Sequence, residues 1–411
     1  MARNPGRRRF SAALGAAAAG AALAPFGLAR AQAQKIRVGV ILPRSGFMGF
    51  IGQSCQKGVD LAPGVIRELL GVEVEIMGAD TESSVDTART RAERLIKEGA
   101  EVLVGAFDSG STMAIAQVAE QRGVPLVVNI AASPVTEQGY KYVFRNFQTA
   151  GDIVRNGLDL IGDLFQATNT VPRTAVYMHV NDTFGQAMTK GIQAMLPQRT
   201  QLPFRIVEDI GYDPATKDLS VEVSKAKATG AEFILLVCRL NDSIVLRREM
   251  LKQRWNPMGI ISPGSPGMYE EQYFKTLGKF SEHSISNVPW YNPKAPLTKI
   301  VEKAFLKQNP KDKLVFHGLN AGFTFEAILV AADAFKRARS TDPKALAEAI
   351  RQTNITSKMM LGGPIRFNAK GQVEGIGSAC VQNLDGLPQV VLPKDAATAK
   401  PVFPVPTYQK T

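Results

Sequence analysis

Four residues that could carry chemistry, Asp108, Ser109, Gly110 and Ser111, follow the apolar run EVLVGAF and open a helical pattern. A serine nucleophile, a phosphate-binding loop and a loop that holds some other ligand would all use such residues. A nucleophile elbow requires G-x-S-x-G, which GAFDSGS does not provide. A phosphate loop requires a lysine, which does not follow Gly110. The pattern therefore favours a loop that binds a ligand without reacting with it.

The same loop has a physical reason to bind an anion. The carboxyl end of a strand leads here into a helix N-terminus, where unpaired N–H groups and the positive end of the helix dipole favour a carboxylate. Open α/β sheets bind ligands at this edge. Ser109 or Ser111 is also expected to cap the helix, and capping alone would contribute about 1 kcal/mol without making a site. We predict that Asp108, Ser109 and Gly110 contribute to a ligand site.

Other arrangements typical of catalysis or metal binding do not occur in the sequence. The three histidines, His179, His283 and His317, show no metal-ligand spacing with one another or with the cysteines. No pair of carboxylates is placed by its spacing for acid–base work. We therefore expect no catalytic residue, no metal and no cofactor, in a protein that is not an enzyme.

Strand and helix patterns alternate along the chain and position these residues. Buried β-branched runs such as 36–43 and 173–180 are typical of strands, whereas residues 85–96 place their apolar side chains on one helical face. The alternation occurs in two rounds, which predicts an α/β protein with two parallel sheets covered on both faces. Three helical segments remain after the second round, and they are expected to cover the first domain again.

This order predicts two lobes, each made from two separate pieces of the chain. The expected boundaries are 1–33 for a leader, 34–147 for the first part of lobe I, 148–287 for the first part of lobe II, 288–360 for the lobe I return, and 361–411 for the lobe II return with a C-terminal tail.

The formal charge of +12 is concentrated at the start of the 411-residue chain. The first 33 residues hold five arginines and no acidic residue, so the remainder carries +7, without a clustered basic block. That distribution argues against nucleic-acid binding. The leader itself, with a basic start, a small-residue apolar core and Ala31-Gln32-Ala33 as a cleavage box, is typical of a secretory signal peptide. Its Arg7-Arg8-Arg9 start fits a twin-arginine signal but also an ordinary secretory one, and we expect an exported, periplasmic protein.

Three widely spaced cysteines, Cys55, Cys238 and Cys380, allow one disulfide with one thiol left over in an exported protein. Cys238 and Cys380 lie inside apolar strand-like runs, which favours three buried, unpaired thiols instead.

The chain resembles the type I periplasmic solute-binding proteins of the branched-chain amino acid (leucine/isoleucine/valine) transport class. The resemblance covers essentially the whole chain after the leader. It depends on the order and spacing of IRVGVILPRSGFMGFIGQ, VLVGAFDSGSTMAIAQVAEQRGVPLVVNIAAS, YVFRN, NDTFGQAMTKG, VPWYN, GFTFEAILVAADA and GPIRFNAKGQV. The resemblance implies two Rossmann-like lobes joined by three crossover strands. It also implies a monomer that closes around one small molecule and delivers it to the membrane subunits of an ABC permease.

The resemblance also extends the predicted site. In the family, the loop that matches NIAASPVT contacts the ligand through its backbone and a hydroxyl, which implies contacts from the Ala131-Ala132-Ser133 segment; the alternative is an ordinary turn before Pro134. Ser45, Phe47 and Phe50 lie on the loop that follows the first strand, where the two rings either form an apolar platform for the ligand or pack beneath the loop. In lobe II the predicted contacts are Phe184, Arg239 and Ser265.

Arg239 has two interpretations. It could bind a ligand carboxylate with two parallel hydrogen bonds, or it could form a surface or inter-lobe salt bridge. The sequence does not decide between them.

The predicted ligand is a small carboxylate. In amino-acid binders of the family, two acidic residues hold the α-ammonium, and the matching positions here fall on Ala150 and Gly264. An ammonium buried without a carboxylate would lose several kcal/mol of solvation, so the resemblance favours an apolar or aromatic acid without an amine over an amino acid. Asp152, two positions from Ala150, remains an alternative partner for an ammonium. A different class of function, a periplasmic receptor that senses amides or amino acids and signals without transport, would be separated by neighbouring permease and ATPase genes.

Overall fold

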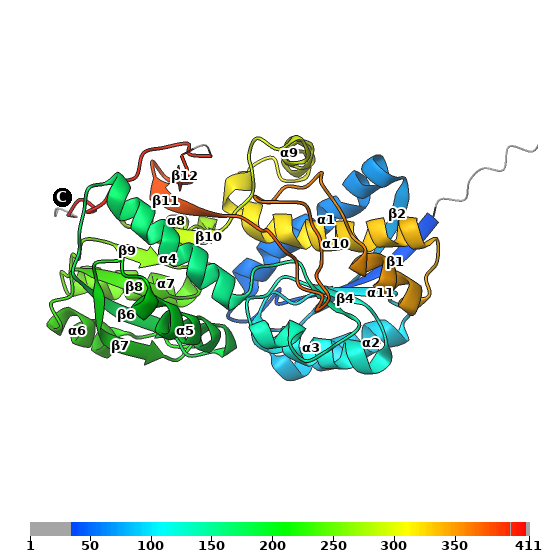
Figure 1. The fold of residues 1–411 in the computed structure, drawn as a ribbon, viewed down its shortest axis with the longest axis horizontal. Coiled ribbons are helices and arrows are strands. Elements are labelled where there is room, and N and C mark those ends of the chain that lie inside the picture. Colours follow the sequence, from blue (N-terminus) through cyan, green and yellow to red (C-terminus); the bar gives the residue numbers. More distant parts are fainter. Residues whose placement is uncertain (1–33, 395, 408–411) are drawn as a thin grey trace, which may run out of the picture. The chain divides into compact units, whose positions relative to one another are not determined.

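One parallel and one mixed sheet organise the protein in this computed structural model, which describes residues 34–394 and 396–407 (Figure 1). Lobe I is the five-stranded sheet and the helices packed on it, and lobe II is the seven-stranded sheet with its helices. The prediction of an α/β protein with two Rossmann-like lobes is confirmed. The predicted signal peptide and its cleavage box lie outside the described residues.

The sheet of lobe I has the order β2-β1-β3-β4-β5, and every pair in it is parallel. Its strands are mostly apolar, as expected for strands buried on both faces, except that the edge strand β2 alternates buried and exposed residues. They are β1 (Gln34–Leu42), β2 (Val72–Asp80), β3 (Val102–Gly105), β4 (Leu126–Val128) and β5 (Val143–Arg145). The connecting helices are α1 (Gly49–Leu70), α2 (Val85–Lys97), α3 (Ser109–Arg122) and the 3₁₀ turn η1 (Ser133–Thr136).

The sheet of lobe II has the order β12-β11-β10-β9-β8-β6-β7. Five strands run parallel, namely β6 (Thr174–Val180), β7 (Arg205–Tyr212), β8 (Phe233–Val237), β9 (Ile260–Ser262) and β10 (Ile285–Pro289). The late strands β11 (Ser378–Leu384) and β12 (Leu387–Leu392) add an antiparallel edge. Its helices are α4 (Ala150–Ala167), α5 (Thr183–Met195), α6 (Ser220–Ala228), α7 (Leu240–Lys252) and α8 (Glu271–Leu277), with 3₁₀ turns η2 (Leu196–Gln198) and η3 (Gly278–Ser281).

The chain then returns to lobe I, as the leftover helical segments predict. The returning helices are α9 (Pro296–Gln308), α10 (Gly318–Ala338) and α11 (Pro343–Arg351), with the 3₁₀ turn η4 (Leu314–Phe316) before α10. Figure 1 shows α10, in yellow, lying along α1, in blue, although the two are far apart in sequence. Among the described residues, α10 alone is long and apolar enough to cross a bilayer, but 94% of its apolar window is buried inside the protein. It is therefore a core helix.

The second return to lobe II comes later than residue 361, where the sequence analysis placed it. Bridges between Ile355 and Ile365, and between Arg145 and Gln372, keep this stretch beside the end of β5. The Phe367 ring also packs edge-on against Phe144, with 5.6 Å between centroids. The segment has no long periodic pattern, so only these long-range contacts reveal that it belongs to lobe I.

The three cysteines are free and buried, as their apolar surroundings predict. Burial raises the pKa of the Cys55 thiol to about 12, because an apolar environment disfavours the thiolate. These thiols contribute to packing and have no reactive form near neutral pH.

Candidate ligand-binding site

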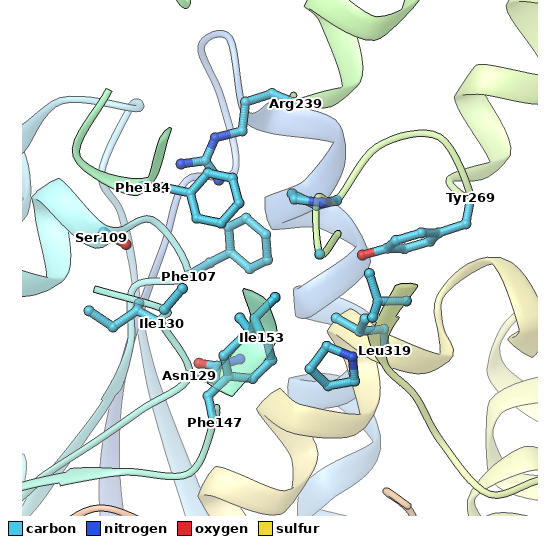
Figure 2. Close-up of a pocket in the computed structure, with 15 residues that line it drawn as sticks. Phe107, Ser109, Asn129, Ile130, Phe147, Ile153, Phe184, Arg239, Tyr269 and Leu319 are labelled. Carbon is cyan, nitrogen blue, oxygen red and sulfur yellow. The ribbon is translucent and has the colours of Figure 1, made fainter. Parts of the chain in front are cut away.

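A pocket lies where loops from both lobes meet (Figure 2). Its walls come from the carboxyl ends of β3, β4, β9 and β10 and from the segment after β5. The first turns of α3, α4, α5 and α10 and the residue before α7 complete them. The carboxyl ends of parallel strands are the edge at which open α/β sheets bind ligands. The lining residues are Phe107, Ser109, Asn129, Ile130, Ala131, Phe147, Ile153, Phe184, Arg239, Gly264, Pro266, Tyr269, Val288, Pro289 and Leu319.

The first turn of α3 forms one wall of this pocket. Asp108 caps the helix, and its Oδ1 accepts the Ser111 N–H at 2.8 Å. The Thr112 hydroxyl accepts the Ala106 N–H at 2.9 Å, which fixes the turn that leads into the helix. Ser109 is buried and lines the pocket. Because the first N–H groups of a helix have no intrahelical acceptor, those of Ser109 and Gly110 are available to a ligand.

Arg239 is the charged residue in the lining and comes from the residue before α7. Its Nε and Nη2 donate to Asp182 Oδ2 at 3.1 and 2.8 Å. Its guanidinium also lies 4.5 Å from the centroid of the Phe184 ring. Arg239 therefore forms a salt bridge within lobe II and faces the pocket at the same time, so both interpretations of its sequence position apply.

The charge of Arg239 is maintained by its neighbours. Burial on its own would lower the pKa of the guanidinium, but Asp182, Asp108 and Asp242 raise it above its usual value. Burial raises the pKa of Asp108, against the lowering effect of the Ser111 N–H and of Arg239. Asp108 belongs to lobe I and Arg239 to lobe II, so their attraction favours the closed arrangement of the lobes.

Arg145 positions the second ligand loop without touching the pocket. Its guanidinium donates to the carbonyl oxygens of Ala132 at 2.7 Å and Ala131 at 3.3 Å, and to the Thr136 hydroxyl at 2.7 Å. It also donates to the Gln372 side chain, which joins the loop to another crossover. Burial lowers the pKa of Arg145 to about 10, so it remains a cation near neutral pH.

Four of the twelve predicted site residues line the pocket, namely Ser109, Ala131, Phe184 and Arg239. The other eight lie outside its lining. Asp108 and Gly110 belong to the α3 cap, and Ser265 supports the lobe II wall by accepting the Cys238 N–H at 2.9 Å. Ala132 and Ser133 face a separate, more open groove between η1 and α5.

The two rings predicted on the first loop do not reach this pocket, so their role as a platform for the ligand stays a prediction. Phe47 and Phe50 are 38% and 51% exposed, and neither contributes to the pocket. The backbone of this loop faces the other lobe instead, because the Phe47 carbonyl accepts the Asn241 side-chain amide at 2.8 Å. Ser45 is exposed as well, and its carbonyl accepts the Ser83 hydroxyl at 2.7 Å. The rings that do line the pocket are Phe107, Phe147, Phe184 and Tyr269.

Sequence reasoning missed most of these apolar walls. Phe107 ends the run that precedes the Asp-Ser-Gly-Ser loop, and it adopts a φ of 76°, a left-handed conformation that a bulky residue rarely takes. Phe147 directly follows the YVFRN stretch, which ends in the first crossover between the lobes. Its place in the sequence could therefore have indicated that it lies near the pocket. Tyr269 carries no local signal, since only the folding of the β9–α8 segment brings it to the pocket.

No acidic side chain lines the pocket among the described residues. A side chain at Gly264 is excluded, because this residue has a φ of 141° and an added Cβ would lie 1.9 Å from Ile153 Cγ2. Asp152 points elsewhere: it accepts the Thr149 hydroxyl at 2.7 Å and pairs with Arg155. Nor does the described part of the chain place three histidine, cysteine or acidic side chains together for a metal ion.

Two α/β lobes that enclose one apolar pocket at their facing loops define a type I solute-binding protein. The sequence model of the family described as periplasmic binding protein matches residues 35–381. The chain therefore belongs to the periplasmic binding protein family, and its role is the binding of a small solute.

Similar proteins include amino-acid binders and an aromatic-acid binder. A Leu/Ile/Val-binding protein homolog 8 of Brucella suis is 25% identical over 96% of this chain and 99% of its own length. LivJ of Streptococcus pneumoniae, solved with isoleucine, superposes with a TM-score of 0.73 at 16% identity, over 86% of this chain and 98% of its own. A solute-binding protein of R. palustris, solved with benzoate, superposes with a TM-score of 0.74 at 17% identity, over 89% and 98% of the two chains.

Proposed function

We propose that this protein is the exported solute-binding subunit of an ABC importer, and that its ligand is an apolar or aromatic carboxylic acid without an amine. The observation that carries the proposal is the charge pattern of the pocket. The lining offers the Arg239 cation and the first turn of α3 but no acidic side chain from the described residues. A carboxylate finds partners in that pocket, whereas an ammonium does not.

The aromatic walls support the rest of the ligand assignment. Phe107, Phe147, Phe184 and Tyr269 surround a space in which a ring or a branched hydrocarbon would be removed from water. Burial of apolar area contributes about 25 cal/mol per Å², and offset or edge-on contacts between rings add about 1 kcal/mol. The relative that was solved with benzoate shares this fold.

Binding and delivery follow from contacts on both lobes. Ser109 and Ala131 come from lobe I, whereas Phe184, Arg239 and Tyr269 come from lobe II. A ligand that touches both sides binds the closed state more tightly than the open state, so it shifts the population toward closure. The permease of the importer would then recognise the closed protein.

Titration calorimetry with benzoate, benzamide and leucine tests the charge assignment. We expect benzoate to bind at least about tenfold more tightly than benzamide, because the amide has the same shape without the charge. Arg239→Met should weaken benzoate binding about tenfold to a hundredfold, as expected for a hydrogen bond to a charged group. Ser109→Ala, which leaves the charges in place, should cause a smaller loss.

The matched control is Asp152→Ala. It removes the acidic residue nearest in sequence to the expected ammonium position, and we expect unchanged affinity for benzoate. Tight leucine binding that is abolished by Asp152→Ala would overturn the proposal and identify an amino-acid binder.

A further inference from the structure

Two polar side chains with no protein partner project into the otherwise apolar part of the pocket. Asn129 follows β4 in lobe I, and Tyr269 precedes α8 in lobe II. Both residues are buried, at 5% and 1% exposure, and both line the pocket. Within the described part of the chain, neither the Asn129 amide nor the Tyr269 hydroxyl makes a hydrogen bond to another residue. Figure 2 shows the Tyr269 hydroxyl directed into the pocket from the side opposite Ser109.

The surrounding side chains leave a ligand or water in the pocket as the partner of these two groups. Their neighbours in the lining include Ile130, Ile153 and Leu319, which offer no hydrogen bond from their side chains. A polar group enclosed by apolar side chains is unfavourable unless a hydrogen bond satisfies it. Burial also raises the pKa of Tyr269 well above its usual value, so its hydroxyl stays protonated and can both donate and accept.

We infer that the ligand is an aromatic acid whose ring carries a hydroxyl group, and that Asn129 and Tyr269 select it by hydrogen bonding to that hydroxyl. This inference rests on the proposed function, because Ser109 and Arg239 must hold the carboxylate. The Asn129 amide and the Tyr269 hydroxyl each combine a donor with an acceptor, which matches a phenolic hydroxyl. A ring with a methyl group in the same place fills the same volume but leaves both protein groups unpaired.

The protein would discriminate a hydroxyl from a methyl substituent mainly because the methyl analogue leaves the polar groups of the protein unpaired. Sites that are built to hydrogen-bond a hydroxyl reject the analogue without it, because the polar groups of the protein are then buried without partners. Even one ordinary hydrogen bond, at about 1.4 kcal/mol, corresponds to a tenfold difference in affinity. A preference of tenfold or more is therefore the expected result.

The test compares the three hydroxybenzoates with the three methylbenzoates by titration calorimetry. We expect the full protein to bind at least one hydroxybenzoate about tenfold or more tightly than the methylbenzoate substituted at the same carbon. Tyr269→Phe and Asn129→Leu should each reduce this ratio, and the double variant should bring it close to one. Tyr291→Phe is the matched control: Tyr291 is also buried, packs against Trp290 and lies outside the pocket lining, so the ratio should not change.

The possible outcomes separate the two proposals. Equal binding of hydroxybenzoates and methylbenzoates, with benzoate still preferred over benzamide, overturns this inference and leaves the proposed function standing. A hydroxyl preference that survives both substitutions overturns the roles of Asn129 and Tyr269. If leucine binds and none of the acids does, both proposals fail. Thermal melting of each variant verifies that a lost preference comes from folded protein.

Discussion

Gly58→Ala is expected to destabilise the protein by about 3 kcal/mol, because no side chain fits between helices α1 and α10 at this position. An added Cβ would lie 2.1 Å from the carbonyl oxygen of Ala321 and 2.9 Å from its Cα. Both are backbone atoms of α10, so they cannot move aside as a flexible side chain would. The helices must separate, and overpacking of this kind costs about 1–3 kcal/mol or more.

The same substitution six residues later in α1 provides the control. An added Cβ at Gly64 meets nothing within 4 Å, and α1 continues through this position. Alanine is the better helix former, so Gly64→Ala should stabilise the protein by about 0.5–1 kcal/mol. Urea denaturation of both variants measures the difference, and equal stabilities would contradict the close approach of the two helices. Leu319, two residues before Ala321, lines the pocket, so Gly58→Ala should also weaken ligand binding.

The fold was predictable because its signals are local and repeated. Most strands of lobe I are apolar runs, the edge strand β2 alternates, and helices α2 and α3 begin at recognisable caps, Ser84 and Asp108. The return of the chain to lobe I could be inferred from α9, α10 and α11, which have no strands of their own between them. The position of the last crossing could not, because it depends on the pairing of Arg145 with Gln372.

The site was predictable only where polar chemistry marked it. Ser109 and Arg239 could be singled out because a serine at a strand-to-helix turn and an arginine before a helix offer hydrogen-bond donors to a ligand, although capping and a salt bridge are their structural alternatives. The residues of the apolar walls carry no such signal in the sequence. Phe107 and Tyr269 cannot be distinguished from ordinary core residues there, and only the fold brings them to the pocket. Phe47 and Phe50 are exposed and lie outside this pocket, so an aromatic residue expected near the cleft did not by itself identify the pocket walls.

Glu270→Gln is expected to make the protein more stable at pH 8 while leaving its stability near pH 5 almost unchanged. Glu270 follows the pocket residue Tyr269 and is buried against α10, where its carboxyl accepts the side-chain amide of Asn320. Burial raises the pKa of Glu270 to about 8, although the bond from Asn320 acts in the opposite direction. The folded protein therefore keeps this carboxyl protonated at pH values where the unfolded chain has lost the proton.

The sign of the effect follows from that difference. Between the ordinary glutamate pKa of 4.5 and the folded value of about 8, the folded state binds one more proton than the unfolded state. The free energy of unfolding therefore falls as pH rises through this window, by about 1.4 kcal/mol per pH unit. Glutamine cannot ionise, so the variant loses this pH dependence and retains its stability at pH 8.

Titration of neighbouring groups would not produce this difference in pH dependence between the wild type and Glu270→Gln. The Cys55 thiol on α1 has a pKa of about 12, and burial also raises the pKa of Tyr269, so neither titrates below pH 8. Asp242 and His317, with pKa values of about 6 and about 4, titrate lower and identically in both proteins.

The measurement is urea denaturation of the wild type and Glu270→Gln at several pH values from 5 to 8.5. Glu271→Gln is the matched control, because Glu271 begins α8 at the surface and pairs with Lys275 at 2.9 Å. A surface ion pair contributes about 0–1 kcal/mol, so this variant should follow the pH profile of the wild type. Parallel curves for the wild type and Glu270→Gln would mean that Glu270 is already ionised in the folded protein. The side-chain oxygen Oδ1 of Asn320 has no hydrogen-bond partner among the described residues, and a carboxyl proton or a glutamine N–H is the donor that such a buried oxygen requires.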